Sequence, residues 1–190
     1  MRCALLGIPW LAGLCLAACA GAPDRFYTLS TLPEPAMAAR PAPTVHVRLN
    51  VTVPSLVDRS EMVLNTSASG ITIFDHERWA APLADQVAQT LGLDLEERRH
   101  DLLVGDRRFD QASLPAVAVK VDIVRMSARS GGDASIEAHW RIVDAGAGTD
   151  RLGSATFSAP LAGDGFGAVA RAYSETVSAL ADALVANLRP

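Results

Sequence analysis

Residues 117–123 read VAVKVDI, and residues 136–142 read IEAHWRI. In both stretches apolar residues alternate with polar or small ones, a period of two that is typical of a strand with one buried face. Gly131 and Gly132 lie between the two stretches and favour a turn. A second glycine-containing turn follows at residues 145–148, and residues 152–161 have the composition of a third strand. Together these residues predict an antiparallel meander.

The residues after the meander predict a long amphipathic helix. It begins near Phe166, after a glycine-rich stretch at residues 163–167 that we interpret as a strand-to-helix turn. Apolar residues then recur at spacings of three and four, which places them on one face of a helix. These residues are Val169, Tyr173, Val177, Leu180, Leu184 and Leu188.

A second helix is predicted before the meander. Its apolar stripe begins at Trp79 and continues through Leu83, Val87 and Leu91. Pro82 is compatible with a helix only in the first turn, so the start is expected near Ala80. Asp75 is expected to be a turn residue or a helix N-cap. The helix is expected to end at Arg98 or Arg99, and residues 96–99 to form a solvated, charged end.

Strands are also predicted nearer the N-terminus, at residues 45–53 and 62–67, with residues 71–74 completing a hairpin. Two amphipathic helices need a shared apolar surface, and a sheet provides one. We therefore predict a two-layer α+β domain at residues 45–190, with two helices packed on one face of a mixed or antiparallel sheet. The charged residues 102–113 are not assigned.

The first residues have the features of a bacterial lipoprotein signal. Arg2 precedes a short apolar run that ends in Leu16-Ala17-Ala18-Cys19. This resembles a lipobox, so residues 1–18 are predicted to be the signal peptide and Cys19 to carry diacylglycerol and acyl lipid. Residues 19–44 are predicted to form the lipidated N-terminus and a tether with a short apolar segment at residues 26–29. The alternative is an ordinary signal peptide cut at an Ala-x-Ala-like site.

Composition excludes several functions. The net charge of −4, without a basic stripe, argues against a nucleic-acid partner. All three cysteines lie within residues 1–19, which excludes a disulfide or a zinc–thiolate site in the mature domain. No two histidines have the helical spacing of a zinc site, and no nucleophile motif is present. We therefore expect no metal, no cofactor besides the lipid, and no enzyme activity.

Three further motifs follow the lipobox in order. The first is Phe26-Tyr27-Thr28-Leu29, and the second is Pro54 with Asp58-Arg59 and Met62-Val63. The third is Arg78-Trp79-Ala80-Ala81-Pro82-Leu83. In this order they resemble the PqiC-type (paraquat-inducible protein C) auxiliary lipoproteins of ABC-type transporters. The chain has Val57 before Asp58-Arg59, where the family most often has leucine.

The resemblance implies a non-catalytic docking component of a lipid transport system. The implied partner is the MCE-domain periplasmic subunit of an ABC-type transporter, and self-association is compatible with it. Ala20 in place of aspartate resembles lipoproteins sorted to the periplasmic face of the outer membrane. The candidate partner-binding residues are Asp58, Arg59, Arg78 and Trp79. The alternative for these four residues is a structural role, because Trp79 begins an apolar stripe and Asp58 can form an ion pair with an arginine. Two other functions stay open: an outer-membrane lipoprotein that aids envelope assembly, and a lipid-anchored hydrolase.

Overall fold

A computed structural model describes residues 22–32, 42–105 and 116–188 of the chain. Its larger sheet has the strand order β5-β2-β6-β7-β8. The strands are β2 (Val45–Thr52), β5 (Leu102–Val104), β6 (Ala116–Ala128), β7 (Asp133–Asp144) and β8 (Thr149–Pro160). Strands β6, β7 and β8 form the predicted antiparallel meander, while β2 pairs in parallel with both β5 and β6. The sheet is therefore mixed, as predicted.

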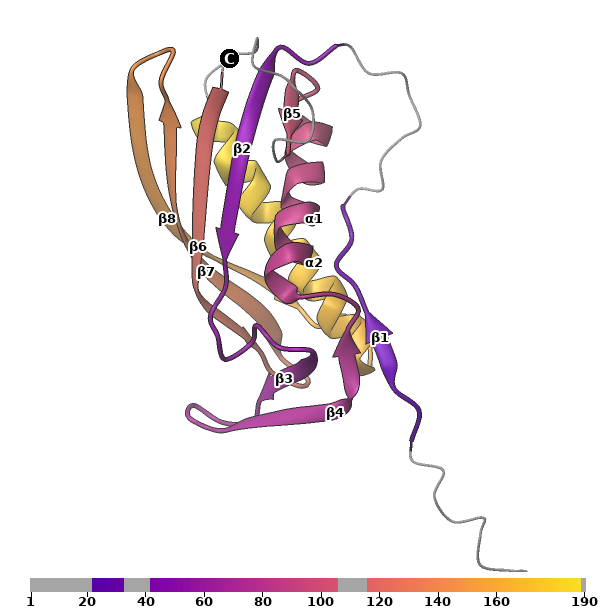
Figure 1. The fold of residues 1–190 in the computed structure, drawn as a ribbon. Helices are drawn as coiled ribbons and strands as arrows, with labels where there is room; N and C mark the ends of the chain where they lie inside the picture. The colour runs from indigo at the N-terminus through magenta and orange to yellow at the C-terminus, as the bar shows by residue number, and fades with distance from the viewer. Residues whose placement is uncertain (1–21, 33–41, 106–115, 189–190) are drawn as a thin grey trace, which may run out of the picture.

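The two predicted helices are α1 (Leu83–Arg98) and α2 (Gly165–Asn187). They lie side by side on one face of the larger sheet (Figure 1). The alternation along β7 explains this, because Ile136, Ala138, Trp140 and Ile142 are buried while the residues between them face away. These side chains meet the helix stripes, in which Val87, Leu91 and Leu180 are fully buried. The predicted α+β class is confirmed.

A second, small sheet lies at one end of the molecule, where the sequence predicted only a hairpin. Its strand order is β1-β4-β3, formed by β1 (Arg25–Tyr27), β3 (Glu61–Asn65) and β4 (Ile71–Trp79). Strand β1 pairs in parallel with the end of β4, so that Tyr27 lies opposite Trp79. The folded region therefore begins well before residue 45, inside the segment that the sequence assigns to the tether.

The start of the first helix also differs from the prediction. Helix α1 begins at Leu83, because Pro82 occupies the N-cap position with a non-helical backbone, φ −49° and ψ 132°. Trp79 and Asp75 therefore belong to β4, and Asp75 is no helix cap. The spacing of four between Trp79 and Leu83 continues across the strand-to-helix boundary by coincidence, which made Trp79 look like the first residue of the helical stripe.

The predicted solvated end of α1 is wrong for Arg98. Its guanidinium donates to the Ser178 hydroxyl at 2.7 Å and contacts Asp182, both on α2, and it lies 3.3 Å from the carboxylate of Asp94. Asp94 is fully buried, and this burial raises its pKa. Arg98 thus joins the two helices.

In the described part of the chain, no helix is long and apolar enough to cross a membrane.

Candidate functional site

The four candidate partner-binding residues lie together at the end of the molecule that carries the small sheet. Asp58 and Arg59 belong to the loop of residues 54–60 between β2 and β3, which we call the docking loop. Arg78 and Trp79 are the last two residues of β4, and the backbone N–H of Trp79 donates to the carbonyl oxygen of Ser60 at 2.7 Å. The motifs that are separated in the sequence therefore meet in one place.

Pro54 shapes the docking loop. Its carbonyl oxygen accepts hydrogen bonds from the backbone N–H groups of Val57 and Asp58, each at 3.0 Å. This turn buries Val57 in the core and brings the Asp58 carboxylate within 3.4 Å of the Ala84 backbone N–H, in the first turn of α1. A carboxylate there stabilises the positive end of a helix. The Pro-x-x-x-Asp-Arg spacing thus positions Asp58 for α1 and leaves Arg59 exposed.

Arg59 and Arg78 belong to a charged cluster that also contains Asp24, Glu61 and His76. Arg59 donates to Glu61 at 2.9 Å, and this hydrogen bond is the main reason that the pKa of Glu61 falls to about 2. Arg78 reaches Glu61 and Asp24, both at 3.4 Å. His76 contacts Asp24 at 2.9 Å, which lowers the pKa of that carboxyl. The cluster ties β1, β3 and β4 to one another.

Trp79 has a structural position. Its side chain is only 5% exposed, and its ring centroid lies 6.3 Å from that of Tyr173 on α2. The next backbone N–H, of Ala80, donates to the carbonyl oxygen of Tyr27 in β1. Trp79 therefore fixes the small sheet against α2, and it has little surface to offer a partner. Of the four candidates, Asp58 and Arg59 are exposed, and Arg78 is partly buried within the charged cluster.

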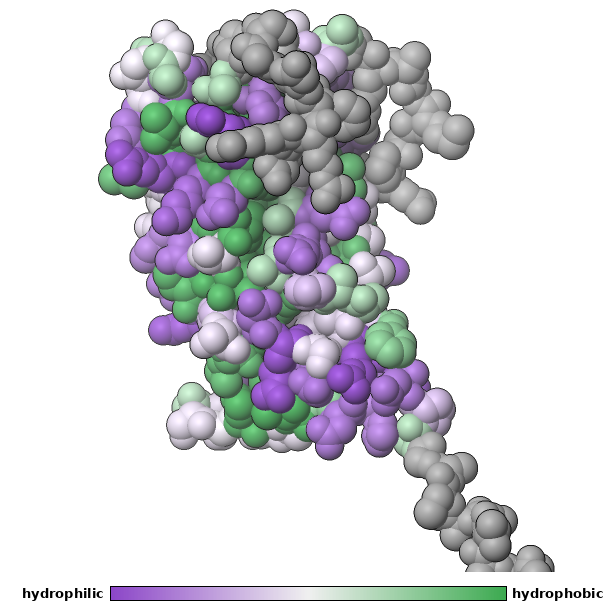
Figure 2. Space-filling view, in the orientation of Figure 1, coloured by the Kyte–Doolittle hydropathy of each residue, from purple (hydrophilic) through white to green (hydrophobic). Residues whose placement is uncertain are grey.

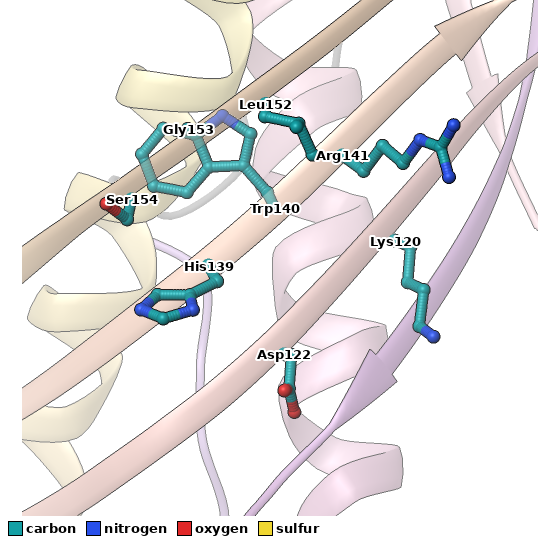
Figure 3. Close-up of a pocket in the computed structure, with 8 residues that line it drawn as sticks. All are labelled: Lys120, Asp122, His139, Trp140, Arg141, Leu152, Gly153 and Ser154. Atoms are coloured by element: carbon teal, nitrogen blue, oxygen red, sulfur yellow. The ribbon is translucent and has the colours of Figure 1, made fainter.

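A separate cavity, missed by the sequence reasoning, lies on the outer face of the larger sheet. It has a volume of about 500 Å³ and is lined mainly by side chains of β6, β7 and β8 (Figure 3). Asp122, His139 and Ser154 are register partners across these three strands. The alternation of the strands could have placed them on one face, but their pairing needed the register.

This row is not joined by hydrogen bonds, because His139 makes none to Ser154 or to Asp122. Asp122 accepts a hydrogen bond from the Thr52 hydroxyl at 2.5 Å, and Figure 3 shows its carboxylate and the His139 ring directed away from each other. A general base has to reach the nucleophile by a hydrogen bond. Among residues 22–32, 42–105 and 116–188, no three His, Cys, Asp or Glu side chains are grouped to hold a metal ion.

Packing behind this cavity depends on Gly153. It lies opposite Trp140, whose ring covers it on the helix-facing side of the sheet. A Cβ atom on residue 153 would be 2.4 Å from the Trp140 ring, which is far closer than van der Waals contact. The cavity residues thus lie on a sheet whose inner face is tightly packed.

The fold and the charged end together define an α+β domain in which polar residues join distant segments of the chain. The model of the ABC-type transport auxiliary lipoprotein component family matches residues 27–185, so the chain belongs to that family. The resemblance found in the sequence motifs is therefore confirmed.

Solved structures support the same fold. An uncharacterised protein superimposes with a TM-score of 0.72 at 16% identity, covering 88% of this chain and 100% of its own. A Xanthomonas campestris protein of the DUF330 family superimposes with a TM-score of 0.65 at 14% identity, covering 85% of this chain and 93% of its own. No curated protein sequence matches the chain.

Proposed function

We propose that this protein is a lipid-anchored docking component that holds the MCE-domain periplasmic subunit of an ABC-type transporter at the outer membrane. Membership of the auxiliary lipoprotein family supports the transport role. The Leu16-Ala17-Ala18-Cys19 sequence, which lies outside the described residues, supports lipid on Cys19. The choice of partner and of membrane follows from the resemblance to PqiC-type lipoproteins.

The observation that carries the docking role is the shape of the docking loop. Its ends are fixed by the Pro54 turn and by the bond between Ser60 and Trp79. Between these points Leu56 is 52% exposed, and Asp58 and Arg59 also face solvent. A rigid loop that presents an exposed leucine beside an arginine needs little ordering on binding, which favours affinity. We place the partner contact on Leu56 and Arg59, with Trp79 and Arg78 supporting the loop from behind.

The test is capture of the MCE-domain subunit from crosslinked membranes. We expect Arg59→Glu and Leu56→Asp to reduce its recovery, because each replaces an exposed contact group with an unmatched charge. Arg125→Glu on β6 is the matched control, since Arg125 is also an exposed arginine beside a glutamate. Leu56→Asp and Arg125→Glu should melt within a few degrees of the wild type, because exposed substitutions change stability by about 0.5 kcal/mol. Arg59→Glu also breaks the hydrogen bond to Glu61 and should melt somewhat lower, so the melting temperature of each variant is measured beside its capture.

Equal recovery by the wild type and both loop variants would show that the docking loop is not the interface. If the wild type itself captures no MCE-domain subunit, the docking function should be replaced by the alternative role in envelope assembly.

A further inference from the structure

Large apolar side chains are exposed on the outer side of the small sheet. Phe26 is 64% exposed, and Ile71 and Ile73 are each 38% exposed. Figure 2 shows hydrophobic surface over β3 and β4 at this end of the molecule, with hydrophilic surface beside it. We call these three residues the apolar patch. The other exposed large apolar residues of the described chain are Leu56, Leu93, Val124 and Leu152.

An irregularity in the sheet explains why the three side chains share the outer side. Glu61 pairs with Arg78 while Met62 pairs with Phe74, so residues 75–77 of β4 have no partner on β3. Phe74 and Trp79 both pack inward, against Phe166 and Tyr173 of α2. The alternation of β4 therefore reverses between them, and Ile71 and Ile73 face outward before the irregularity. Beyond it Arg78 faces outward, with Phe26 as its partner on β1.

The chain that leads to the proposed lipid anchor on Cys19 joins the domain at the same end. Five residues lie between Cys19 and Arg25, the first residue of β1, and an extended chain of that length spans at most about 20 Å from Cys19 to Arg25. Helix α2 begins beside the small sheet, where Phe166 contacts Tyr27 and Phe74, and its 23 residues rise about 35 Å toward the opposite end. Lipid on Cys19 would therefore hold the small sheet, of all parts of the domain, close to the bilayer.

Charge does not provide the attraction to lipid here. Arg25, Arg59 and Arg78 are each paired with Asp24, Glu61 or Glu77. Anionic lipid is recognised by unpaired basic clusters, and this end has none among its described residues. The apolar patch is small, but an anchor on Cys19 would hold it near the bilayer at a high effective concentration. Weak contacts between the patch and lipid would then be enough to orient the domain.

We propose that Phe26, Ile71 and Ile73 seat the small sheet on the lipid surface that carries the anchor. This inference rests on the proposed lipidation of Cys19. The patch fixes the orientation of the domain: α2 points away from the bilayer, and the docking loop lies near the lipid headgroups.

The test uses the full-length lipidated protein in vesicles of phosphatidylethanolamine and phosphatidylglycerol. Because Cys19 is the only cysteine after the signal and its thiol carries lipid, Ile73→Cys gives a single site for an environment-sensitive fluorophore. Leu152→Cys is the control: Leu152 is 79% exposed and lies at the opposite end, where the neighbouring Arg151 bonds the last residue of α2. We expect spin-labelled lipid to quench the probe severalfold more strongly at residue 73 than at residue 152, with no loss at high salt.

Equal quenching at the two positions, in protein that floats with the vesicles, would overturn the patch while leaving the anchor intact. Quenching that disappears at high salt would also overturn it, because that contact would be electrostatic. Cys19→Ser is expected not to float with the vesicles. If the wild type also fails to float, both the anchor and the patch are overturned. As a second variant, Ile71→Asp combined with Ile73→Asp should reduce quenching of a probe at Phe26→Cys, and unchanged quenching would contradict the patch.

Discussion

The charged cluster at the small sheet and the outer face of the larger sheet use ion pairs differently. Across the larger sheet the pairs join neighbouring strands of one meander, as Arg141 does with Asp150 at 2.9 Å. At the small sheet Arg78 and His76 bond Asp24, more than 50 residues earlier in the chain. The first kind of pair lies on a sheet whose strands are already held together by backbone hydrogen bonds. The second kind, together with Trp79, joins segments that have few backbone bonds of their own.

The largest effect is expected from Trp79→Ala. Loss of a buried indole between β4 and Tyr173 removes transfer free energy and leaves a cavity, so the free energy of unfolding should fall by about 3–5 kcal/mol. Chemical denaturation of the detergent-solubilised protein measures this change. The control is Leu152→Ala on the outer face of the larger sheet, which should change stability by no more than about 0.5 kcal/mol. A small effect of Trp79→Ala would mean that the small sheet is held mainly by its charges.

An intermediate effect is expected from Gly153→Ala in the larger sheet. The added Cβ would clash with the Trp140 ring, and such overpacking should lower the free energy of unfolding by about 1–3 kcal/mol. The same denaturation experiment tests it, with Ser154→Ala as the neighbouring control on the exposed face. If Gly153→Ala is neutral, the Trp140 ring can move aside and the inner packing of this sheet is looser than that of the small sheet.

The smallest effect concerns the pH dependence of the charged cluster. The pKa of Glu61 is lowered from 4.5 to about 2, so the folded state favours the ionised form. The stability that this provides is present above pH 4.5 and is lost as the pH falls toward 2. Glu61→Gln should therefore flatten the pH dependence of stability in that window. Urea denaturation at several pH values measures it, and Asp75→Asn on the neighbouring strand β4 is the control. An unchanged slope would show that the Glu61 contacts do not contribute to folding.

Sequence periodicity predicted the elements of the fold that have long periodic patterns of apolar residues. The meander and α2 have many alternating or helically spaced apolar residues, so their strands and helix were placed correctly. Strand β1 was missed as part of the folded domain because its three residues stand between stretches rich in proline and alanine. No period can develop over three residues, and the pairing of β1 with β4 is a long-range contact.

For the candidate site, the motifs identified the right end of the molecule but not the role of each residue. Trp79 fitted the helical spacing of Leu83 and Val87, so its place in β4 was not foreseen. The bonds of Arg98 to α2 were missed for a related reason, since Asp182 lies 84 residues away in the sequence. Residue type and spacing indicate that a charge matters, while its partner depends on how distant segments pack.

The parallel pairing of β1 also has a mechanical consequence. Its first residue, Arg25, is the end of the strand that precedes the others in the chain, so a lipid on Cys19 would pull on the strand from that end. The bonds that hold this segment lie across that direction: the register with β4, Leu29 to Gln86 at 3.0 Å, and Ser30 to Ser174 at 3.1 Å. Such bonds share a load and break together, whereas a segment peeled sideways loses them one at a time. A force applied at the N-terminal end of β1 would therefore load these bonds in shear.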